Sequence, residues 1–313
     1  MKSDLRHKQR SFINGAVFFK MLAALALIIG FAALAVTLPA SPGKTLQANL
    51  NSEVDNLIAK TGSTPDTALN TFSSADDVKL IYKRNTSVWT GGLNWTGVVA
   101  SHPLNGPVGV HNSYVVGGGA LITPQDMVGA AHFAVGNIQI NFVDANNEVH
   151  SATIIGQTKI EGTDIQVMHF SSPLPSSIKY YKILPDNYCD YTPDYALGSY
   201  PILLLLDEAR DTEKKAYVLD SVGHLLASGE IMYTACTEKD RAPYTWTVNS
   251  GSGSPAFVVI NGEPVLLGCL HTTASFSNLT AKAEAINVAL KSLGSTYQLT
   301  TVDLSGFVYY SRN

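Results

Sequence analysis

The sequence has few charged residues, few cysteines and no excess of basic residues. Only 15% of its 313 residues are charged and 45% are hydrophobic, whereas an ordinary soluble domain has about 25% charged residues. A chain of this composition has enough apolar surface to fold, which excludes an intrinsically disordered protein. The 21 Lys and Arg residues are outnumbered by 25 Asp and Glu residues, giving a net charge of −4. No basic surface is therefore expected for nucleic-acid phosphates, and we expect no nucleic-acid partner.

The three cysteines, Cys189, Cys236 and Cys269, are too few to build a disulfide-rich fold. They also lack the CxxC spacing of a zinc site, and the histidines outside the motifs described below show no metal-ligand spacing. We therefore expect no metal and no other cofactor. Three cysteines allow at most one bridge within the chain, and the sequence leaves its pairing open.

Residues 21–38 (MLAALALIIGFAALAVTL) form an uncharged apolar run behind a leader rich in Lys and Arg. A membrane-spanning helix needs about 20 apolar residues, and basic residues stay on the cytoplasmic side. Two interpretations of residues 1–40 stay open: a signal peptide cleaved at the A-x-A site of residues 33–35, or an uncleaved apolar helix that anchors the protein. Both predict an extracytoplasmic protein that is secreted, periplasmic or anchored by one N-terminal transmembrane helix.

Residues 41–77 are predicted to be a linker or a propeptide. Apolar residues at helical spacing predict a short amphipathic helix within 44–61: Leu46, Leu50, Val54, Leu57 and Ile58. Residues 62–77 (GSTPDTALNTFSSADD) are small, polar and turn-forming, which indicates a linker.

The body of the chain, from about residue 78, alternates short apolar runs with turn residues. The runs 120–122, 138–143 and 256–260 are examples. This pattern predicts an all-β barrel or sandwich. Helical periodicity returns over 281–293, with Thr280 as the expected N-cap. The tail, 294–313, has a strand-like stretch at 298–304 and no assigned role.

Three separate blocks carry residue types suited to nucleophilic catalysis. In residues 128–133 (VGAAHF), small residues let the backbone pack closely before His132. In residues 162–170, Asp164 opens an alternating strand, and its carboxylate can accept a hydrogen bond from a histidine Nδ1–H and so fix the tautomer. Taken singly, His132 is more simply a structural histidine and Asp164 a turn residue.

The third block is residues 249–255 (NSGSGSP), in which glycines flank Ser252. Glycines allow a tight turn that directs successive N–H groups to one point, as an oxyanion hole requires. A serine in such a turn becomes a nucleophile when a histidine takes its proton. The simpler interpretation of this block is an ordinary Gly/Ser turn.

The order His132, Asp164, Ser252 is the chymotrypsin order among the convergent triads. On these motifs the chain resembles the trypsin/chymotrypsin-like serine peptidases over about residues 80–292. Residues 129–133 match the family's T-A-A-H-C, residues 164–167 (DIQV) match D-I-A-L, and residues 250–255 match G-D-S-G-[GS]-P. Residues 265–268 (VLLG) look like the family's cleft-lining L-V-G strand.

The resemblance implies an all-β domain over 78–293, made of two six-stranded antiparallel β-barrels and a C-terminal helix. It implies a serine endopeptidase that hydrolyses a polypeptide substrate through an acyl-enzyme, without metal or cofactor. Ser252 would attack the carbonyl, His132 would transfer the proton and Asp164 would orient His132. The backbone N–H groups of Ser250 and Ser252 would bind the oxyanion.

The chain departs from the family at three positions near these motifs. Gly251 stands where the animal enzymes have an aspartate that pairs with the N-terminus released on activation. That switch is therefore absent, and the chain looks closer to bacterial-type members. Ser250 replaces the usual oxyanion glycine, and Phe133 replaces the cysteine after the histidine.

Three residues bear on substrate specificity. Trp246 stands where trypsin has an aspartate, so cleavage after Lys or Arg is not expected. Thr247 and His271 stand near the places where bacterial glutamyl endopeptidases use a threonine and a histidine to hold an acidic side chain. His271 is one residue late, which would turn it to the other face of a regular strand unless a bulge intervenes. Glutamyl specificity is therefore one hypothesis, and a histidine that only lines the cleft or packs is the other.

Two other functions compete with the peptidase. A pseudopeptidase would use the barrel cleft to bind a protein partner or ligand, which Ser250 and Gly251 favour and the retention of all three motif residues disfavours. An esterase-like α/β hydrolase is excluded because it needs Ser before Asp before His and parallel βαβ units.

Overall fold

The computed structural model describes residues 43–61, 69–76, 79–100, 118–133, 138–192, 200–207, 214–221, 224–225, 230–232, 243, 251–272 and 275–310. All of these except Gly43 belong to one compact unit, Lys44–Asn313. Within the described ranges, no helix combines the length and the apolar character needed to cross a bilayer. The apolar helix predicted within 1–40 lies outside the described residues.

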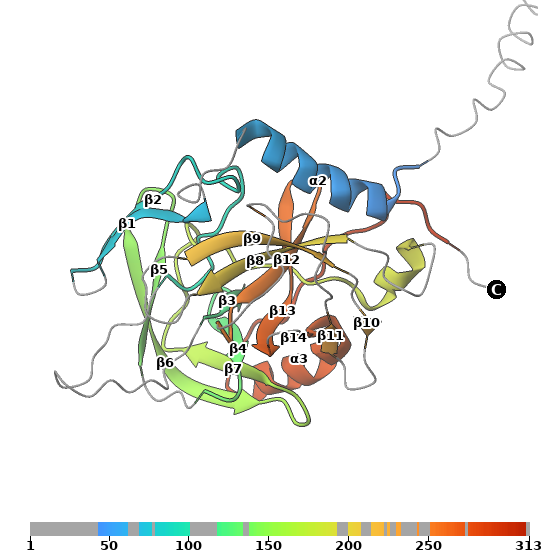
Figure 1. Ribbon diagram of the computed structural model, residues 1–313. Helices are drawn as coiled ribbons and strands as arrows, with labels where there is room; N and C mark the ends of the chain where they lie inside the picture. The colour runs from blue at the N-terminus through green and yellow to red at the C-terminus, as the bar shows by residue number, and fades with distance from the viewer. Residues whose placement is uncertain are drawn as a thin grey trace, which may run out of the picture. The chain divides into compact units, whose positions relative to one another are not determined.

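The first sheet is a curled, five-stranded antiparallel sheet in the order β3-β4-β7-β6-β5 (Figure 1). Its strands are β3 (Ala120–Thr123), β4 (Asp126–Ala130), β5 (Gln139–Val143), β6 (Val149–Lys159) and β7 (Ile165–Phe170). Residues 97–100 link its two edges. The Val99 N–H donates to the Gly119 carbonyl (3.1 Å), and the Ala100 N–H donates to the Asn141 carbonyl (2.9 Å).

The second sheet has seven antiparallel strands in the order β10-β11-β14-β13-β12-β8-β9. Its strands are β8 (Tyr200–Asp207), β9 (Lys214–Ser221), β10 (His224–Leu225), β11 (Glu230–Met232), β12 (Pro255–Ile260), β13 (Glu263–Thr272) and β14 (Ser275–Ser277). Asn261 and Gly262 connect β12 to β13, both at positive φ (51° and 77°). Asn-Gly is the pair that a two-residue type I′ hairpin turn favours, so the local sequence fixes this hairpin.

Two curled antiparallel sheets and a C-terminal helix fit a double β-barrel fold, as predicted at that level. The two larger sheets formed by the described strands have five and seven strands, whereas six strands were predicted for each barrel. Residues 97–100 join the first sheet by isolated hydrogen bonds instead of a ladder, and the short β10 and β11 extend the second sheet. The two sheets share one apolar core, in which Val128 and Ile165 of the first sheet cluster with Phe257 and Leu266 of the second.

Helix α3 (Ala283–Ser292) confirms the helix predicted near the C-terminus, and it buries Ile286, Ala289 and Leu290 on one face. The predicted N-cap is wrong. Thr280 lies in a short 3₁₀ turn, η3 (Thr280–Lys282), before the helix. Its hydroxyl donates to the Leu184 carbonyl (3.0 Å) instead of capping α3. The Thr280 hydroxyl thus bonds to a residue distant in the sequence and not to a backbone N–H of α3.

The strand-like stretch predicted at 298–304 is paired only at isolated positions. The Ile183 N–H donates to the Thr300 carbonyl, and the Val302 N–H donates to the Ile183 carbonyl, both at 2.9 Å. Ile183 lies just before the 3₁₀ helix η2 (Asp186–Tyr191). The tail then buries Leu304 and Phe307 in the core of the second sheet.

The predicted amphipathic helix is present as α2 (Leu46–Thr61), which lies against β8 and β12 (Figure 1, blue). Leu46 and Leu50 pack in the same apolar cluster as Ile202 of β8 and Val258 of β12. Asn49 is fully buried, and its Oδ1 accepts the Asn261 N–H at 3.2 Å. Helix α2 therefore forms part of the core of the compact unit.

Part of the predicted linker also belongs to this unit. Within 62–77, residues 72–76 form β1 (Phe72–Asp76), which pairs antiparallel with β2 (Ile81–Arg84). The Arg84 side chain is half-buried. Its Nε donates to the Asp144 carbonyl (3.0 Å), and its guanidinium lies 5.3 Å from the centre of the Phe72 ring. Removal of residues 41–77 in maturation stays a prediction.

Because Leu50 of α2 is only 5% exposed, we expect Leu50→Ala to lower the free energy of unfolding of the whole unit by about 2–4 kcal/mol. Urea unfolding of the full-length protein, followed by circular dichroism, measures the change. The matched control is Asp55→Ala on the exposed face of the same helix, which we expect to change stability by less than about 0.5 kcal/mol. Equal effects of the two substitutions would show that α2 does not contribute to the core.

Candidate functional site

His132 and Asp164 meet at one end of the β4–β7 pair. The two strands are antiparallel, with Ala130 opposite Ile165, so the residues just beyond these positions come together. The His132 N–H donates to Asp164 Oδ1 (2.8 Å), and His132 Nδ1 lies 2.7 Å from Asp164 Oδ2. The Ala131 N–H donates to the Asp164 carbonyl (2.9 Å). The ring and the backbone of His132 therefore both contact the carboxylate, and a backbone hydrogen bond holds the two segments together.

These contacts determine which ring nitrogen of His132 is available to a substrate. A carboxylate oxygen only accepts hydrogen bonds, so Nδ1 carries the hydrogen and the neutral ring presents its lone pair at Nε2. The His132 side chain is 44% exposed and the Asp164 side chain 13% exposed. The pair thus has a sheltered carboxylate and an accessible imidazole, which is the arrangement a general base requires.

Ser252 lies in a tight turn between two glycines at positive φ, Gly251 (105°) and Gly253 (88°). Side chains other than glycine rarely adopt this backbone conformation, so the Gly-Ser-Gly sequence specifies the turn. The turn is anchored to β13. The Gly253 N–H donates to the Leu270 carbonyl (2.7 Å), and the Leu270 N–H donates to the Ser254 carbonyl (2.8 Å).

The Ser252 turn packs against the first sheet through glycines. A Cβ atom added to Gly118 would lie 3.0 Å from backbone atoms of Gly253 and Ser254, and one added to Gly129 would lie 3.2 Å from the Gly118 carbonyl oxygen. The turn therefore lies beside the Gly118 segment, and that segment lies beside β4 just before His132. The close approach explains why these positions need glycine.

Two observations describe the reactive atoms. Among the described residues, the Ser252 backbone N–H donates to no partner, as expected of an oxyanion donor. No hydrogen bond joins Ser252 Oγ to His132 Nε2 within the same residues. Their engagement stays a prediction, because such hydrogen bonds are often long without substrate.

Cys269 of β13 is a neighbour of the site that the sequence did not single out. It is 2% exposed, and its Sγ lies 3.8 Å from the Val128 carbonyl of β4. Burial, and secondarily the charge of Asp164, raise the pKa of the Cys269 thiol to about 12. The thiol is therefore protonated at neutral pH. It packs between β13 and β4 beside Asp164.

His271 follows this part of β13 and lies at a bulge. Leu270 pairs with Phe276 and Thr272 with Ser275, so His271 is the extra residue between two ladder pairs. Such a bulge redirects a side chain from the face it would otherwise occupy. His271 Nδ1 lies 3.0 Å from Ser275 Oγ, which also contacts Thr272 Oγ1 (2.8 Å). Ser275 thus fixes the position of His271 Nδ1.

The other predicted site residues, Ser250, Trp246 and Thr247, lie outside the described residues, so their roles stay predictions. Cys236 also lies outside them, and within the described residues no disulfide joins Cys189 to Cys269.

Asp144, Glu148 and His150 have ligand-type atoms within 4.8 Å of one another in the β5–β6 turn. Asp144 Oδ1 already accepts the Asn146 N–H (2.8 Å) and the Glu148 N–H (2.9 Å), and Oδ2 lies 3.3 Å from His150 Nε2. Burial raises the pKa of Asp144, but these hydrogen bonds and His150 outweigh it, so the pKa is lowered overall. The carboxylate is used to close the turn.

Comparison with known proteins finds no protein-family model that matches the chain and no curated protein with a matching sequence. A function for this site therefore rests on its geometry and its motifs.

Because the Cys269 thiol is buried and protonated, we expect iodoacetamide to alkylate it at least about tenfold more slowly than the half-buried Cys189 at pH 8. Mass spectrometry of the folded full-length protein, resolved by cysteine, gives both rates. Cys189 is the internal control, and denaturation in guanidinium should equalise the two. Rapid alkylation of Cys269 in the folded protein would show that the reagent reaches the contact between β13 and β4 beside Asp164, and would contradict the burial of this thiol.

Proposed function

We propose that the protein is a trypsin/chymotrypsin-like serine endopeptidase, exported or tethered to a membrane by residues 21–38. The observation that carries this proposal is the double hydrogen bond from the His132 backbone and ring to the Asp164 carboxylate. It is supported by the position of the Ser252 turn beside β4, where a nucleophile for this base is needed.

The proposed mechanism follows from the groups available. His132 Nε2 takes the Ser252 hydroxyl proton as Oγ attacks a peptide carbonyl, and Asp164 stabilises the imidazolium that forms. The N–H groups of Ser252 and Ser250 bind the oxyanion. Collapse of the intermediate returns the proton from His132 to the leaving amine, and water then hydrolyses the acyl-enzyme by the same steps. No cofactor is needed for this chemistry.

The alternative is a pseudopeptidase that binds a protein partner or ligand in the cleft. The missing hydrogen bond between Ser252 Oγ and His132 Nε2 among the described residues favours it. A reagent that requires an activated serine distinguishes the two functions.

We expect a fluorophosphonate probe to label the full-length protein at Ser252, because the His132–Asp164 pair activates that hydroxyl. In-gel fluorescence and peptide mapping measure labelling. Ser252→Ala should abolish it, and Asp164→Asn should slow it by about 10⁴-fold because the imidazole tautomer is no longer fixed.

The matched control is Ser171→Ala, which alters an exposed serine after β7 and should leave labelling unchanged. Labelling that persists in Ser252→Ala would refute the assigned nucleophile. A folded protein that takes no label at all would favour the pseudopeptidase.

We also propose that His271 selects an acidic residue on the acyl side of the cleaved bond. Two features support this. The bulge frees His271 from the regular alternation of β13, and the preceding residue, Leu270, is hydrogen-bonded to Gly253 and Ser254, directly after Ser252.

For peptides that differ only in Glu or Gln at this position, we expect His271→Ala to lower kcat/KM for the Glu peptide by at least about tenfold and to affect the Gln peptide less. Steady-state hydrolysis of the matched pair measures the ratio. His150→Ala, a histidine change in the β5–β6 turn, should leave the ratio unchanged. An unaltered Glu/Gln ratio in His271→Ala would leave His271 as a packing residue.

A further inference from the structure

A second His–Asp pair lies on β4 and β7, at the ends of these strands opposite to the ends that position His132 and Asp164. Asp126 begins β4 and lies directly opposite His169 of β7. His169 Nδ1 lies 2.7 Å from Asp126 Oδ1. The second pair is the reverse of the first, because here the aspartate belongs to β4 and the histidine to β7.

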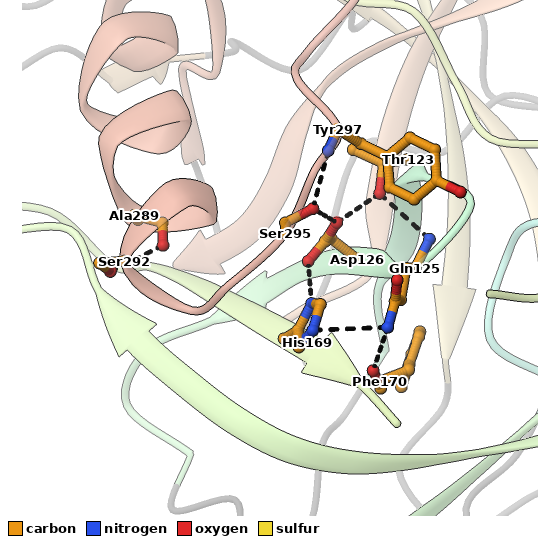
Figure 2. Close-up of polar contacts among 9 residues, drawn as sticks. All are labelled: Thr123, Gln125, Asp126, His169, Phe170, Ala289, Ser292, Ser295 and Tyr297. Atoms are coloured by element: carbon orange, nitrogen blue, oxygen red, sulfur yellow. Dashed lines mark hydrogen bonds and ion pairs between the residues drawn. The ribbon is translucent and has the colours of Figure 1, made fainter. Parts of the chain in front are cut away.

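The second pair is buried and its hydrogen bonds are complete, as Figure 2 shows. The Asp126 side chain is 0% exposed and the His169 side chain 7% exposed. Asp126 Oδ2 accepts the hydroxyl protons of Thr123 and of Ser295, the latter at 2.6 Å. The carboxylate therefore has a donor from β3, one from β7 and one from the chain after α3.

The hydrogen bonds also fix the His169 tautomer. The Gln125 side-chain amide donates to the Phe170 carbonyl (2.8 Å), and its nitrogen also faces His169 Nε2 at 3.5 Å. A second amide hydrogen is thus directed at Nε2, which accepts it when Nδ1 carries the ring hydrogen. His169 is held at both nitrogens, whereas no partner within the described residues holds His132 at Nε2.

The turn at the end of α3 places Ser295 next to Asp126. Gly294 is at φ 88°, its N–H donates to the Lys291 carbonyl (3.1 Å), and the Ser295 N–H donates to the Leu290 carbonyl (3.0 Å). This is the Schellman motif that ends many helices at a glycine. The local sequence at the helix end therefore directs the Ser295 hydroxyl to Asp126.

Apolar patterning alone does not fix how β4 and β7 pair. Every residue of both strands is buried, so the in-and-out alternation that normally sets register is weak. A slip of two residues would move one strand by about 7 Å. Asp126 would then face Val167 or Ser171 instead of His169, and a buried carboxylate without its partner is strongly disfavoured.

We propose that Asp126 and His169, supported by Ser295, are positioning residues that lock the register of β4 against β7. This register is what brings His132 and Asp164 within 2.7 Å at the other end of the same ladder. The cluster thus acts on the reacting groups through the strands and touches no substrate. The proposal rests on the proposed peptidase function only for its kinetic consequence.

The first test is His169→Phe, which keeps a ring of similar size and removes the Nδ1–H donor. At a temperature where circular dichroism shows the full-length variant folded, we expect kcat to fall by roughly 10- to 100-fold with KM changed by less than about twofold. We also expect loss of the downfield proton resonance of the His132 Nδ1–H. That resonance reports the His132–Asp164 hydrogen bond whether or not the protein hydrolyses peptides.

The matched control is Leu50→Ala, which weakens the packing of α2 on β8 and β12 and leaves β4 and β7 unaltered. We expect it to retain kcat and the resonance. A folded His169→Phe with native kcat and an intact resonance would overturn the proposal, as would equal loss of the resonance in Leu50→Ala.

Ser295→Ala is the milder variant if His169→Phe does not fold. It removes one donor to Asp126 Oδ2 and leaves the Asp126–His169 pair in place. We expect a smaller fall in kcat and a broadened His132 resonance, and an unchanged resonance would count against the proposal. If wild-type protein shows the resonance but takes no fluorophosphonate label, the proposed function fails and the register proposal is still decided by the resonance.

Discussion

Antiparallel pairing of β4 with β7 is the constraint on which the site depends. His132 and Asp164 are not on the strands but just beyond their ends, so their 2.7 Å contact is set by where the ladder stops. In an antiparallel pair, a change of register shifts the partners at both ends of the ladder by the same number of residues. The ladder therefore couples the geometry of the exposed pair to whatever holds the strands elsewhere.

The two His–Asp pairs use the same chemistry in opposite environments. The buried pair is surrounded by donors, so its charge distribution is fully compensated and its ring cannot turn. The His132–Asp164 pair has an imidazole that is 44% exposed and that no described residue holds at Nε2, so it contributes less to holding the strands together. A rigid buried cluster and an accessible base are thus complementary requirements, and placing them at opposite ends of one ladder satisfies both.

The serine turn could be predicted from its immediate neighbours, whereas His132 and Asp164 were singled out because the three blocks occur in the order His, Asp, Ser. Gly251 and Gly253 are required by positive φ, and the small residues before His132 allow the close approach at Gly129. No neighbouring residues in the sequence identify the Asp126–His169 pair, since its two members are 43 residues apart. Thr280 was misassigned for the same reason, because its hydroxyl bonds to a carbonyl 96 residues away.

Helix α2 shows a different limit of sequence reasoning. Periodicity identified the apolar face of α2. Such a face shows that another surface covers the helix, but it does not show which surface, because a stalk helix and a core helix both have an apolar face. The polar, turn-rich residues after α2 indicated a linker, yet the Thr71 N–H donates to the Lys214 carbonyl (2.8 Å) and Phe72 packs on Tyr82. The described residues within 44–84 thus contact both sheets, because Thr71 bonds to Lys214 of β9 and Phe72 and Tyr82 cluster with Val143 of β5. Cleavage after α2 would expose the apolar surface that Leu46 and Leu50 now cover, so a fragment lacking this helix would differ from the compact unit in its core and not only in its length.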